Sequence, residues 1–488
     1  MAFYSRTMEV GAGVPARGLR WPLALAAAGG LAALLRVLFR GMPLTSDEGG
    51  FGVIVRLWRD GAELYDEAWV DRPQGLLLLF RGVLAVSDSA DALRAAAVVV
   101  ALLVLVASAL VARKLIGEKA AIIAVFLLAT AGASPFIESF TLAGELAASL
   151  FAVCSLLAFL TFLERRDLRF AAVAGLLTGC AMLMKQSGFD AGLAAVAFLL
   201  WKERARRGVR AAGAFAVAAL VPVVVAAAAA PDLGNWWYAV VTYRFEGDSI
   251  VTDSPATRLL MLAIGLRPAA LALAVPLVLA IGGWRSSPLL LRLWLVAALV
   301  GVAGGGNFWR HYWIQIVPPL TMIAAVRLKA MFESGDLRRP LRALPLAVAV
   351  AFSLWVTVPL LFADKDERVR RAMSGDVLRV YDDDIVAYVR SHTAPGERVA
   401  IIPTAGGSIQ FLADRPPAFR YLWFGPARSI PGAVPELRSM LRDDPPALVV
   451  VLADPRFLDP SGETTAILRT RYRVVERIGP TAVVAPRR

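Results

Sequence analysis

The sequence has few of the residues from which most metal and redox sites are built. In 488 residues it contains two cysteines, Cys154 and Cys180, and two histidines, His311 and His392. Both cysteines lie within apolar segments and predict neither a disulfide framework nor a metal cluster. Two histidines are too few for a His-rich zinc site. The GxGxxG, GxSxG and P-loop signatures have no convincing counterpart, so nucleotide binding and serine hydrolase chemistry lack support.

Charged residues are also scarce. They make up 19% of the chain, against 58% hydrophobic residues, and the mean hydropathy is +0.62. This composition is typical of a polytopic membrane protein. The net charge of +13 comes mainly from short basic clusters between apolar segments, which is the pattern of cytoplasmic loops. Nucleic acid is therefore not an expected partner. The clusters span residues 113–119, 165–169, 202–210 and 327–342.

Apolar segments predict eleven transmembrane helices. They cover about residues 22–40, 91–112, 119–133, 143–163, 168–184, 188–201, 211–230, 256–282, 289–305, 312–326 and 343–362. A helix that crosses a bilayer needs about 20 residues. Several of these segments are shorter, so the number of spans stays open by one or two. If Arg6, Arg17 and Arg20 hold the N-terminus in the cytoplasm, every basic cluster lies on that side of the inner (plasma) membrane.

Residues 1–363 are thus expected to form the transmembrane domain, with a first outer loop at 41–90. In that loop, residues 50–58 and 75–86 are apolar but too short to cross a bilayer. We expect them to form juxtamembrane helices at the membrane interface.

Residues 364–488 have the composition of a soluble domain. Residues 382–393 follow a helical pattern, and β-branched runs at 397–403, 447–453 and 472–478 predict strands. Strands that alternate with helices predict a small α/β domain. Eleven spans from a cytoplasmic start place it on the extracytoplasmic side.

The first outer loop is rich in acids, although the neighbouring segments almost lack them. Residues 45–75 contain Asp47, Glu48, Asp60, Glu63, Asp66, Glu67 and Asp71. Carboxylates at the edge of a membrane are costly to bury and usually serve a substrate or ion path. Gly49 and Gly50, which follow the first acid pair, allow a ligand or a backbone to approach closely. A solvated loop without a function is the alternative explanation.

Further polar groups fall on the same predicted outer face. They are Arg72 beside Asp71, Lys185 with Gln186, and Arg310 with His311 and Tyr312. Opposed carboxylates and cations suit a reaction at a phosphate-bearing lipid. A carboxylate can accept the proton of an attacking hydroxyl, and Arg and Lys can neutralise a departing phosphate. A divalent cation (Mg²⁺, Mn²⁺ or Ca²⁺) bridged by Asp47 and Asp71 is compatible with these residues but is not required.

Each of these groups also has a purely structural explanation. Lys185 and Arg310, at the ends of spans, could equally extend their side chains to the membrane interface. His311 beside Tyr312 could be an interfacial histidine with satisfied hydrogen bonds. We expect Glu138, in the turn after residue 133, to solvate that turn.

Four motifs resemble those of the GT-C superfamily of lipid-phosphate-dependent glycosyltransferases, in particular the bacterial branch related to protein mannosyltransferases and aminoarabinose transferases. The likeness in layout covers most of residues 20–362. The motifs are SDEGGF (46–51), similar to the acidic motif after the first span; VDRPQG (70–75), similar to a second acidic motif; GLLTGCAMLMKQSG (175–188), similar to a glycine-rich span that ends in lysine; and FWRHYWIQIVPPL (308–320), similar to an HY…Q…PPL segment.

The resemblance implies roles for these residues. Asp47 would be the catalytic base or its metal-binding equivalent, and Asp71 would be the second acid. Arg72 and Lys185 would bind the donor phosphate. The remaining substrate-binding residues would be Glu48, Gln186, Arg310, His311 and Tyr312. Gln74 and Arg72 depart from the proline and lysine that are common in the family, which leaves the sugar open.

By the same resemblance, the protein would transfer a sugar from a polyprenyl phosphate to a glycan, lipid or protein acceptor of the cell envelope, in one displacement with inversion. The C-terminal domain would help to bind the acceptor. A transporter or flippase of lipid-linked sugars is the main alternative, and a scaffold with an inactive site is another. A transporter would place polar residues near the middle of the membrane, whereas here they concentrate at one face.

Overall fold

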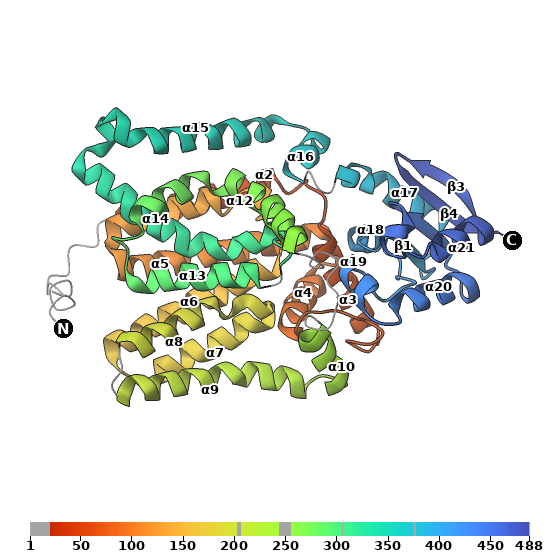
Figure 1. Ribbon diagram of the computed structural model, residues 1–488, viewed down its shortest axis with the longest axis horizontal. Coiled ribbons are helices and arrows are strands. Elements are labelled where there is room, and N and C mark those ends of the chain that lie inside the picture. The colour runs from red at the N-terminus through yellow and green to blue at the C-terminus, as the bar shows by residue number, and fades with distance from the viewer. Residues whose placement is uncertain (1–19, 203–205, 244–254, 305, 374–376, 488) are drawn as a thin grey trace.

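The computed structural model describes residues 20–487, except 203–205, 244–254, 305 and 374–376. A bundle of long helices carries a smaller α/β domain at one end, where the C-terminus also lies (Figure 1). Arg6 and Arg17, which are expected to hold the N-terminus in the cytoplasm, lie outside the described residues.

Ten helices of the described chain build the bundle. They are α2 (Arg20–Leu38), α5 (Ala90–Ala131), α6 (Gly144–Arg165), α7 (Leu168–Met184), α8 (Asp190–Lys202), α9 (Arg206–Ala228), α12 (Pro255–Gly283), α13 (Leu289–Ala303), α14 (Val317–Ser334) and α15 (Pro340–Phe362). By length and composition, seven helical segments of the described residues are able to cross a membrane. The predicted multi-pass helical fold is confirmed, and the number of spans stays a prediction.

Helix α5 contains two of the predicted spans, 91–112 and 119–133. At Gly117 the backbone leaves the helical conformation, with φ 79° and ψ 166°. A positive φ favours glycine, which has no Cβ to clash. The break lies within the basic cluster 113–119, so it divides α5 where the sequence predicts a cytoplasmic turn.

The span predicted at 312–326 begins and ends later than expected. Residues Arg310–Ile316 form a short 3-10 helix, η4, and α14 then runs from Val317 to Ser334. Pro318 and Pro319 lie in the first turn of α14, where the missing N–H groups cost no hydrogen bond within the helix. The prolines therefore set the start of α14 and leave Arg310, His311 and Tyr312 in a turn at the end of the bundle.

Short elements connect these helices. They are η1 (Pro135–Ile137), η2 (Gln186–Phe189), α10 (Leu233–Trp237), η3 (Tyr238–Thr242) and η5 (Asp336–Arg338). Residues 41–90, the predicted first outer loop, form two helices, α3 (Ser46–Arg59) and α4 (Gln74–Val86), as predicted. Both lie between the bundle and the C-terminal domain (Figure 1).

Helix α3 begins four residues earlier than its apolar run, because Thr45 and Glu48 form a capping box. Three glycines bring it close to the C-terminal domain. A Cβ on Gly49 would lie 2.4 Å from the backbone of Ser408, and a Cβ on Gly52 would lie 2.5 Å from the ring of Phe411. The C-terminal domain thus covers one side of this helix, whose position at a membrane interface stays a prediction.

The C-terminal domain contains a four-stranded sheet in the order β1-β2-β4-β3. Strand β1 (Val399–Ile402) is parallel to β2 (Leu448–Val451), whereas β4 (Thr481–Pro486) is antiparallel to β2 and to β3 (Tyr472–Ile478). The three predicted strands are present. The sequence patterns did not predict β4, a short run that ends in proline and pairs with β3 across the turn at Gly479.

The other elements of the C-terminal domain are helices. They are α16 (Lys365–Ala372), η6 (Val377–Tyr381), α17 (Asp382–His392), α18 (Gly407–Ala413), α19 (Phe424–Ser429), α20 (Ala433–Asp443), η7 (Pro455–Phe457) and α21 (Glu463–Arg471). The helix predicted at 382–393 is α17. The loops that follow β1 lead to α18 and α19 and bring Ser408 and Trp423 against α3.

Candidate active site

Charged side chains from distant parts of the sequence meet where the bundle joins α3 and the C-terminal domain. Asp47, Asp71 and Arg72 come from the first outer loop, and Glu138 comes from the turn after η1. Glu145 lies at the start of α6, Lys185 at the end of α7, and His311 in η4. We call these seven residues the polar cluster. All of them lie at one end of the bundle, as the predicted common outer face requires.

His311 connects three acids of the cluster. Its Nδ1 lies 3.1 Å from Oε2 of Glu138, and its Nε2 lies 3.6 Å from Oδ2 of Asp47 and 3.7 Å from Oε1 of Glu145. Burial alone would raise the pKa of Glu138, but the hydrogen bond with His311 holds this pKa below its ordinary value. The expectation that Glu138 solvates a turn is wrong, because its side chain is only 9% exposed and bonded to His311.

Asp47 is the most open of these acids. Its side chain is 28% exposed, compared with 3% for Glu145. Oδ1 of Asp47 accepts a hydrogen bond of 2.8 Å from the indole N–H of Trp423, which belongs to the C-terminal domain. Asp47 is therefore the carboxylate of the cluster that a substrate can reach most easily.

Asp71 and Arg72 form an ion pair, with Oδ1 of Asp71 2.8 Å from Nη1 of Arg72. Burial opposes the charge of Arg72, yet Asp71, Tyr312 and Asp47 together hold its pKa above the ordinary value. Gln186 donates a hydrogen bond of 2.7 Å to the backbone carbonyl of Asp71. In the structure Gln186 thus fixes the loop that carries the pair.

Lys185 lies inside the protein and pairs with Glu145. Its ammonium group lies 3.3 Å from the centre of the Tyr312 ring, a cation–π contact. The Lys185 side chain is only 8% exposed. The alternative explanation, in which Lys185 extends to the membrane interface, does not fit this position.

Two of the predicted substrate-binding residues make structural contacts instead of joining the cluster. Glu48 forms a buried ion pair with Arg94, at 3.1 Å, and accepts a hydrogen bond of 2.9 Å from the backbone of Leu142. Arg310 donates a hydrogen bond of 2.6 Å to the carbonyl of Ala372 in the C-terminal domain. Their roles in substrate binding stay predictions, which these contacts do not favour.

Sequence analysis overlooked two residues of the site. Glu145 is an acid at the start of an apolar segment, a signal that could have marked it, since acids in such positions usually have a partner or a task. Trp423 carried no such signal, because only the docking of the C-terminal domain brings it to Asp47.

The site offers little to a metal ion. Among the described residues, no three His, Cys, Asp or Glu side chains are placed to hold one. Asp71 faces Arg72, and Asp47 accepts a hydrogen bond from Trp423. Carboxylates already paired with cations and N–H donors are poor ligands for a hard cation. The residues therefore do not fit a bridging cation, which stays a prediction without structural support.

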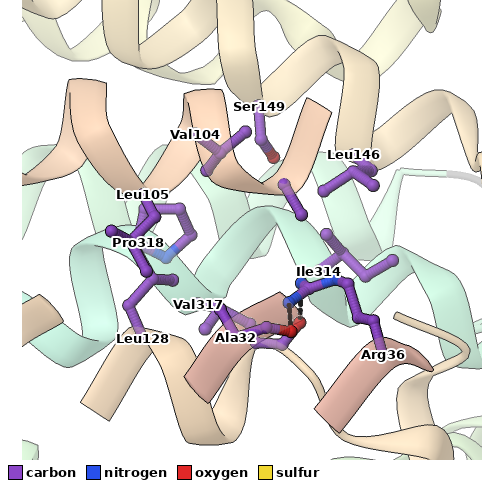
Figure 2. A pocket seen from close by; sticks show the side chains of 12 residues that line it. Ala32, Arg36, Val104, Leu105, Leu128, Leu146, Ser149, Ile314, Val317 and Pro318 are labelled. Carbon is purple, nitrogen blue, oxygen red and sulfur yellow. Dashed lines mark hydrogen bonds between the residues drawn. The ribbon is translucent and has the colours of Figure 1, made fainter. Parts of the chain in front are cut away.

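An apolar cavity lies deeper in the bundle, between α2, α5, α6 and α14 (Figure 2). Leu105, Leu128 and Val317 are among its lining residues, and Arg36 is its charged one. The Arg36 guanidinium donates hydrogen bonds to the carbonyls of Ser139 and Ala32, at 3.2 and 3.3 Å, and to that of Gly132. With its donors directed at the backbone, Arg36 gives this cavity little to hold a phosphate.

The sequence and the fold are both similar to those of known proteins. Residues 71–230 match the model of the dolichyl-phosphate-mannose-protein mannosyltransferase family. The fold is similar to that of ArnT from Cupriavidus metallidurans bound to undecaprenyl phosphate, with 16% identity, a TM-score of 0.59, and 96% of this chain and 98% of that chain covered. Among curated proteins, none matches the sequence.

Two further structures extend the comparison. ArnT from the same organism in the apo state is 18% identical, with a TM-score of 0.60 and the same coverage. The oligosaccharyltransferase AglB from Archaeoglobus fulgidus, in complex with an inhibitory peptide and a dolichol-phosphate, is 14% identical, with a TM-score of 0.54 and coverage of 96% of this chain and 74% of that chain.

The chain is thus a multi-pass membrane protein with the fold of ArnT and of the oligosaccharyltransferase AglB. Its residues 71–230, which include Asp71, Arg72 and Lys185, are similar to the protein mannosyltransferases.

Proposed function

We propose that the protein is a membrane glycosyltransferase that moves a sugar from a polyprenyl phosphate to an acceptor of the cell envelope. The observation that carries this proposal is the convergence of Asp47, the Asp71–Arg72 pair and Lys185 at one end of the bundle. These groups supply a carboxylate that a substrate can reach and cations beside it. The family match supports a lipid-phosphate sugar as donor.

The proposed reaction is a single displacement. The hydroxyl oxygen of the acceptor attacks the anomeric carbon of the sugar, and Asp47 accepts the hydroxyl proton. The bond between the anomeric carbon and the phosphate oxygen breaks, polyprenyl phosphate leaves, and the anomeric configuration inverts. General base catalysis of this kind is typically worth about 10²–10⁴-fold.

The cations act on the leaving group. Negative charge grows on the phosphate as the bond breaks, so a cation beside it stabilises the transition state more than the bound donor. Arg72 can contact two phosphate oxygens at once. Lys185 is held by Glu145 and Tyr312, and we propose that it shares its charge with the phosphate when the donor binds. Asp71 orients Arg72, and whether it also acts as a second acid stays a prediction.

We further propose that the site faces the outer side of the inner membrane, with the N-terminus in the cytoplasm. The basic clusters support this orientation. The turn between α14 and α15, within the cluster 327–342, lies at the end of the bundle opposite the C-terminal domain (Figure 1). By the positive-inside rule we take that end as cytoplasmic, so we propose that the polar cluster and the C-terminal domain lie outside.

A transporter of lipid-linked sugars fits these observations less well. It would require polar groups near the middle of the membrane. In the part of the chain that the structure describes, the polar cluster lies at helix ends instead.

The direct test is to incubate the purified protein with a panel of polyprenyl-phosphate sugars and to follow each donor by mass spectrometry. We expect one donor to be consumed, with release of polyprenyl phosphate. In proteoliposomes, movement of intact donor between leaflets without release of polyprenyl phosphate would instead establish a flippase. Consumption of no donor in the panel would contradict the proposed function.

A further inference from the structure

We propose that Trp423 of the C-terminal domain is a positioning residue for the transfer, because its indole N–H holds the Asp47 carboxylate in the orientation that accepts the acceptor proton. This inference rests on the proposed function. It adds a residue from outside the membrane bundle to the site, so the C-terminal domain would be part of the catalytic unit as well as a partner for the acceptor.

The contact itself is well formed. The indole nitrogen of Trp423 lies 2.8 Å from Oδ1 of Asp47, a normal hydrogen-bond distance. An indole N–H donates a hydrogen bond and accepts none, so Trp423 neither takes nor supplies the transferred proton. It fixes one oxygen of Asp47 and leaves the other, Oδ2, which faces His311 at 3.6 Å, for the reaction.

The Trp423 ring is held in place by α3. Its centre lies 5.3 Å from that of the Phe51 ring. On another side, a Cβ built on Gly50 would lie 2.6 Å from Cζ2 of Trp423, so the ring rests directly on the glycine backbone. Gly50 and Phe51 follow Asp47 in the same helix. The ring that bonds to Asp47 is therefore packed on the next turn of the helix that carries Asp47.

A second set of contacts holds the chain just before Asp47. The Ser46 hydroxyl donates a hydrogen bond of 2.6 Å to the carbonyl of Ala405. Arg379 donates to Ser46 Oγ at 2.5 Å and to the carbonyl of Leu44 at 2.8 Å. The C-terminal domain thus fixes the backbone at the start of α3 while Trp423 fixes the side chain of Asp47. A misplacement of about 1 Å at a reacting group can cost about 10²-fold in rate.

The test is the variant Trp423→Phe, which keeps an aromatic ring between Phe51 and Gly50 but removes the N–H. We expect kcat to fall about 10- to 100-fold, with the KM for the polyprenyl-phosphate donor almost unchanged, because the lost contact orients the base and does not touch the donor. Trp58→Phe is the matched control. Trp58 lies in α3, the helix that carries Asp47, but it packs on Arg81. We therefore expect this variant to keep the wild-type kcat.

A second variant separates positioning from simple packing. Gly50→Ala would push the Trp423 ring away from Asp47 while keeping both residues. If the N–H bond is what matters, Gly50→Ala lowers kcat, and adding it to Trp423→Phe lowers kcat little further, because both changes remove the same contact. If Trp423 only helps to dock the domain, each variant lowers the unfolding temperature, and the loss in kcat follows the loss of stability.

The outcomes distinguish the two proposals. Transfer by the wild type together with an unchanged kcat of Trp423→Phe would overturn the positioning role and leave the proposed function intact. A loss in kcat that follows the loss of stability in both variants would also overturn it. Absence of transfer by the wild type with every donor of the panel would overturn the proposed function, and the positioning role with it.

Discussion

Two neighbouring acids in the first turn of α3, Asp47 and Glu48, differ in burial and in the role that we expect for them. Glu48 is buried, with 1% of its side chain exposed. Its carboxylate oxygens contact Arg94, the backbone N–H of Leu142 and the Thr45 cap. Asp47, one residue earlier, is 28% exposed and faces His311 and Trp423. Because a helix turns about 100° per residue, adjacent acids point in different directions. In this pair, Glu48 is therefore the buried, structural acid and Asp47 is the accessible one.

The difference in burial separates what each acid is expected to contribute. Removing one partner of a buried ion pair leaves an uncompensated charge and costs about 3–5 kcal/mol of stability. Removing a partly exposed carboxylate costs little stability but removes a possible proton acceptor. The two acids should therefore respond to mutation in different measurements.

The largest expected effect is on Asp47. The variant Asp47→Asn keeps the size of the side chain but cannot accept a proton, so we expect turnover of the polyprenyl-phosphate donor to fall about 10²–10⁴-fold. Mass spectrometry of released polyprenyl phosphate measures it. The unfolding temperature should stay near that of the wild type. Wild-type turnover in this variant would remove Asp47 as the base.

Glu48 should show the reverse behaviour. In Glu48→Gln, Arg94 stays buried without its charge partner, so we expect a loss of about 3 kcal/mol in the free energy of unfolding. A thermal or denaturant unfolding series in detergent measures this loss. Glu63→Gln, a change of an exposed acid in the same loop, is the control and should unfold like the wild type. If Glu48→Gln is as stable as the control but has lost donor binding, Glu48 belongs to the site after all.

A change of Glu138 should affect turnover less than a change of Asp47 and more than a change of Glu48. Glu138→Gln removes the charge that orients His311, and we expect turnover to fall about 10-fold, as for other residues that orient a histidine through its second nitrogen. The rate, compared with that of the wild type at pH 7, measures this effect. An unchanged rate would mean that His311 does not take part in the reaction.

The stability of the Glu138 variant should depend on pH. Since the pKa of Glu138 is held below its ordinary value, the stabilisation from this contact is complete above the ordinary glutamate pKa of about 4.3 and is lost as the pH falls through the lowered value. The difference in unfolding temperature between the wild type and Glu138→Gln should therefore be largest near neutral pH and shrink on acidification. A difference that grows below pH 4 would contradict the assigned direction of the shift.

Metal removal should have the smallest effect. Asp47 and Asp71 already face N–H donors and a guanidinium, so we expect EDTA to leave the transfer rate unchanged. The measurement is turnover before and after dialysis against the chelator, followed by addition of Mg²⁺, Mn²⁺ or Ca²⁺. Loss of activity that one of these ions restores would establish the bridging cation instead.

Local patterns predicted those parts of the molecule that depend on neighbouring residues. Apolar length indicated the membrane helices, and β-branched runs indicated β1, β2 and β3. Motifs in the sequence also pointed to Asp47, Asp71, Arg72, Lys185 and His311, whose side chains do meet in space. The apolar run at 312–326 predicted too early a start for α14, because Pro318 and Pro319 occupy the first turn of that helix.

Such local patterns do not predict contacts between residues that lie far apart in the sequence. Glu138 was expected in solvent, but η4 covers it with His311, 173 residues away in the sequence. Trp423 lies 376 residues from Asp47 in the sequence, and no pattern near either residue predicts their hydrogen bond. A tryptophan after a loop is equally compatible with the core of the C-terminal domain.

The sequence alone therefore determined the membrane bundle, the soluble C-terminal domain and the set of charged residues available for chemistry, since hydropathy and motif spacing are properties of the chain itself. Tertiary structure decided which charges are paired and buried and which one stays open to a substrate. That choice depends on packing between segments far apart in the chain, because desolvation and charge pairing depend on what surrounds a side chain in space.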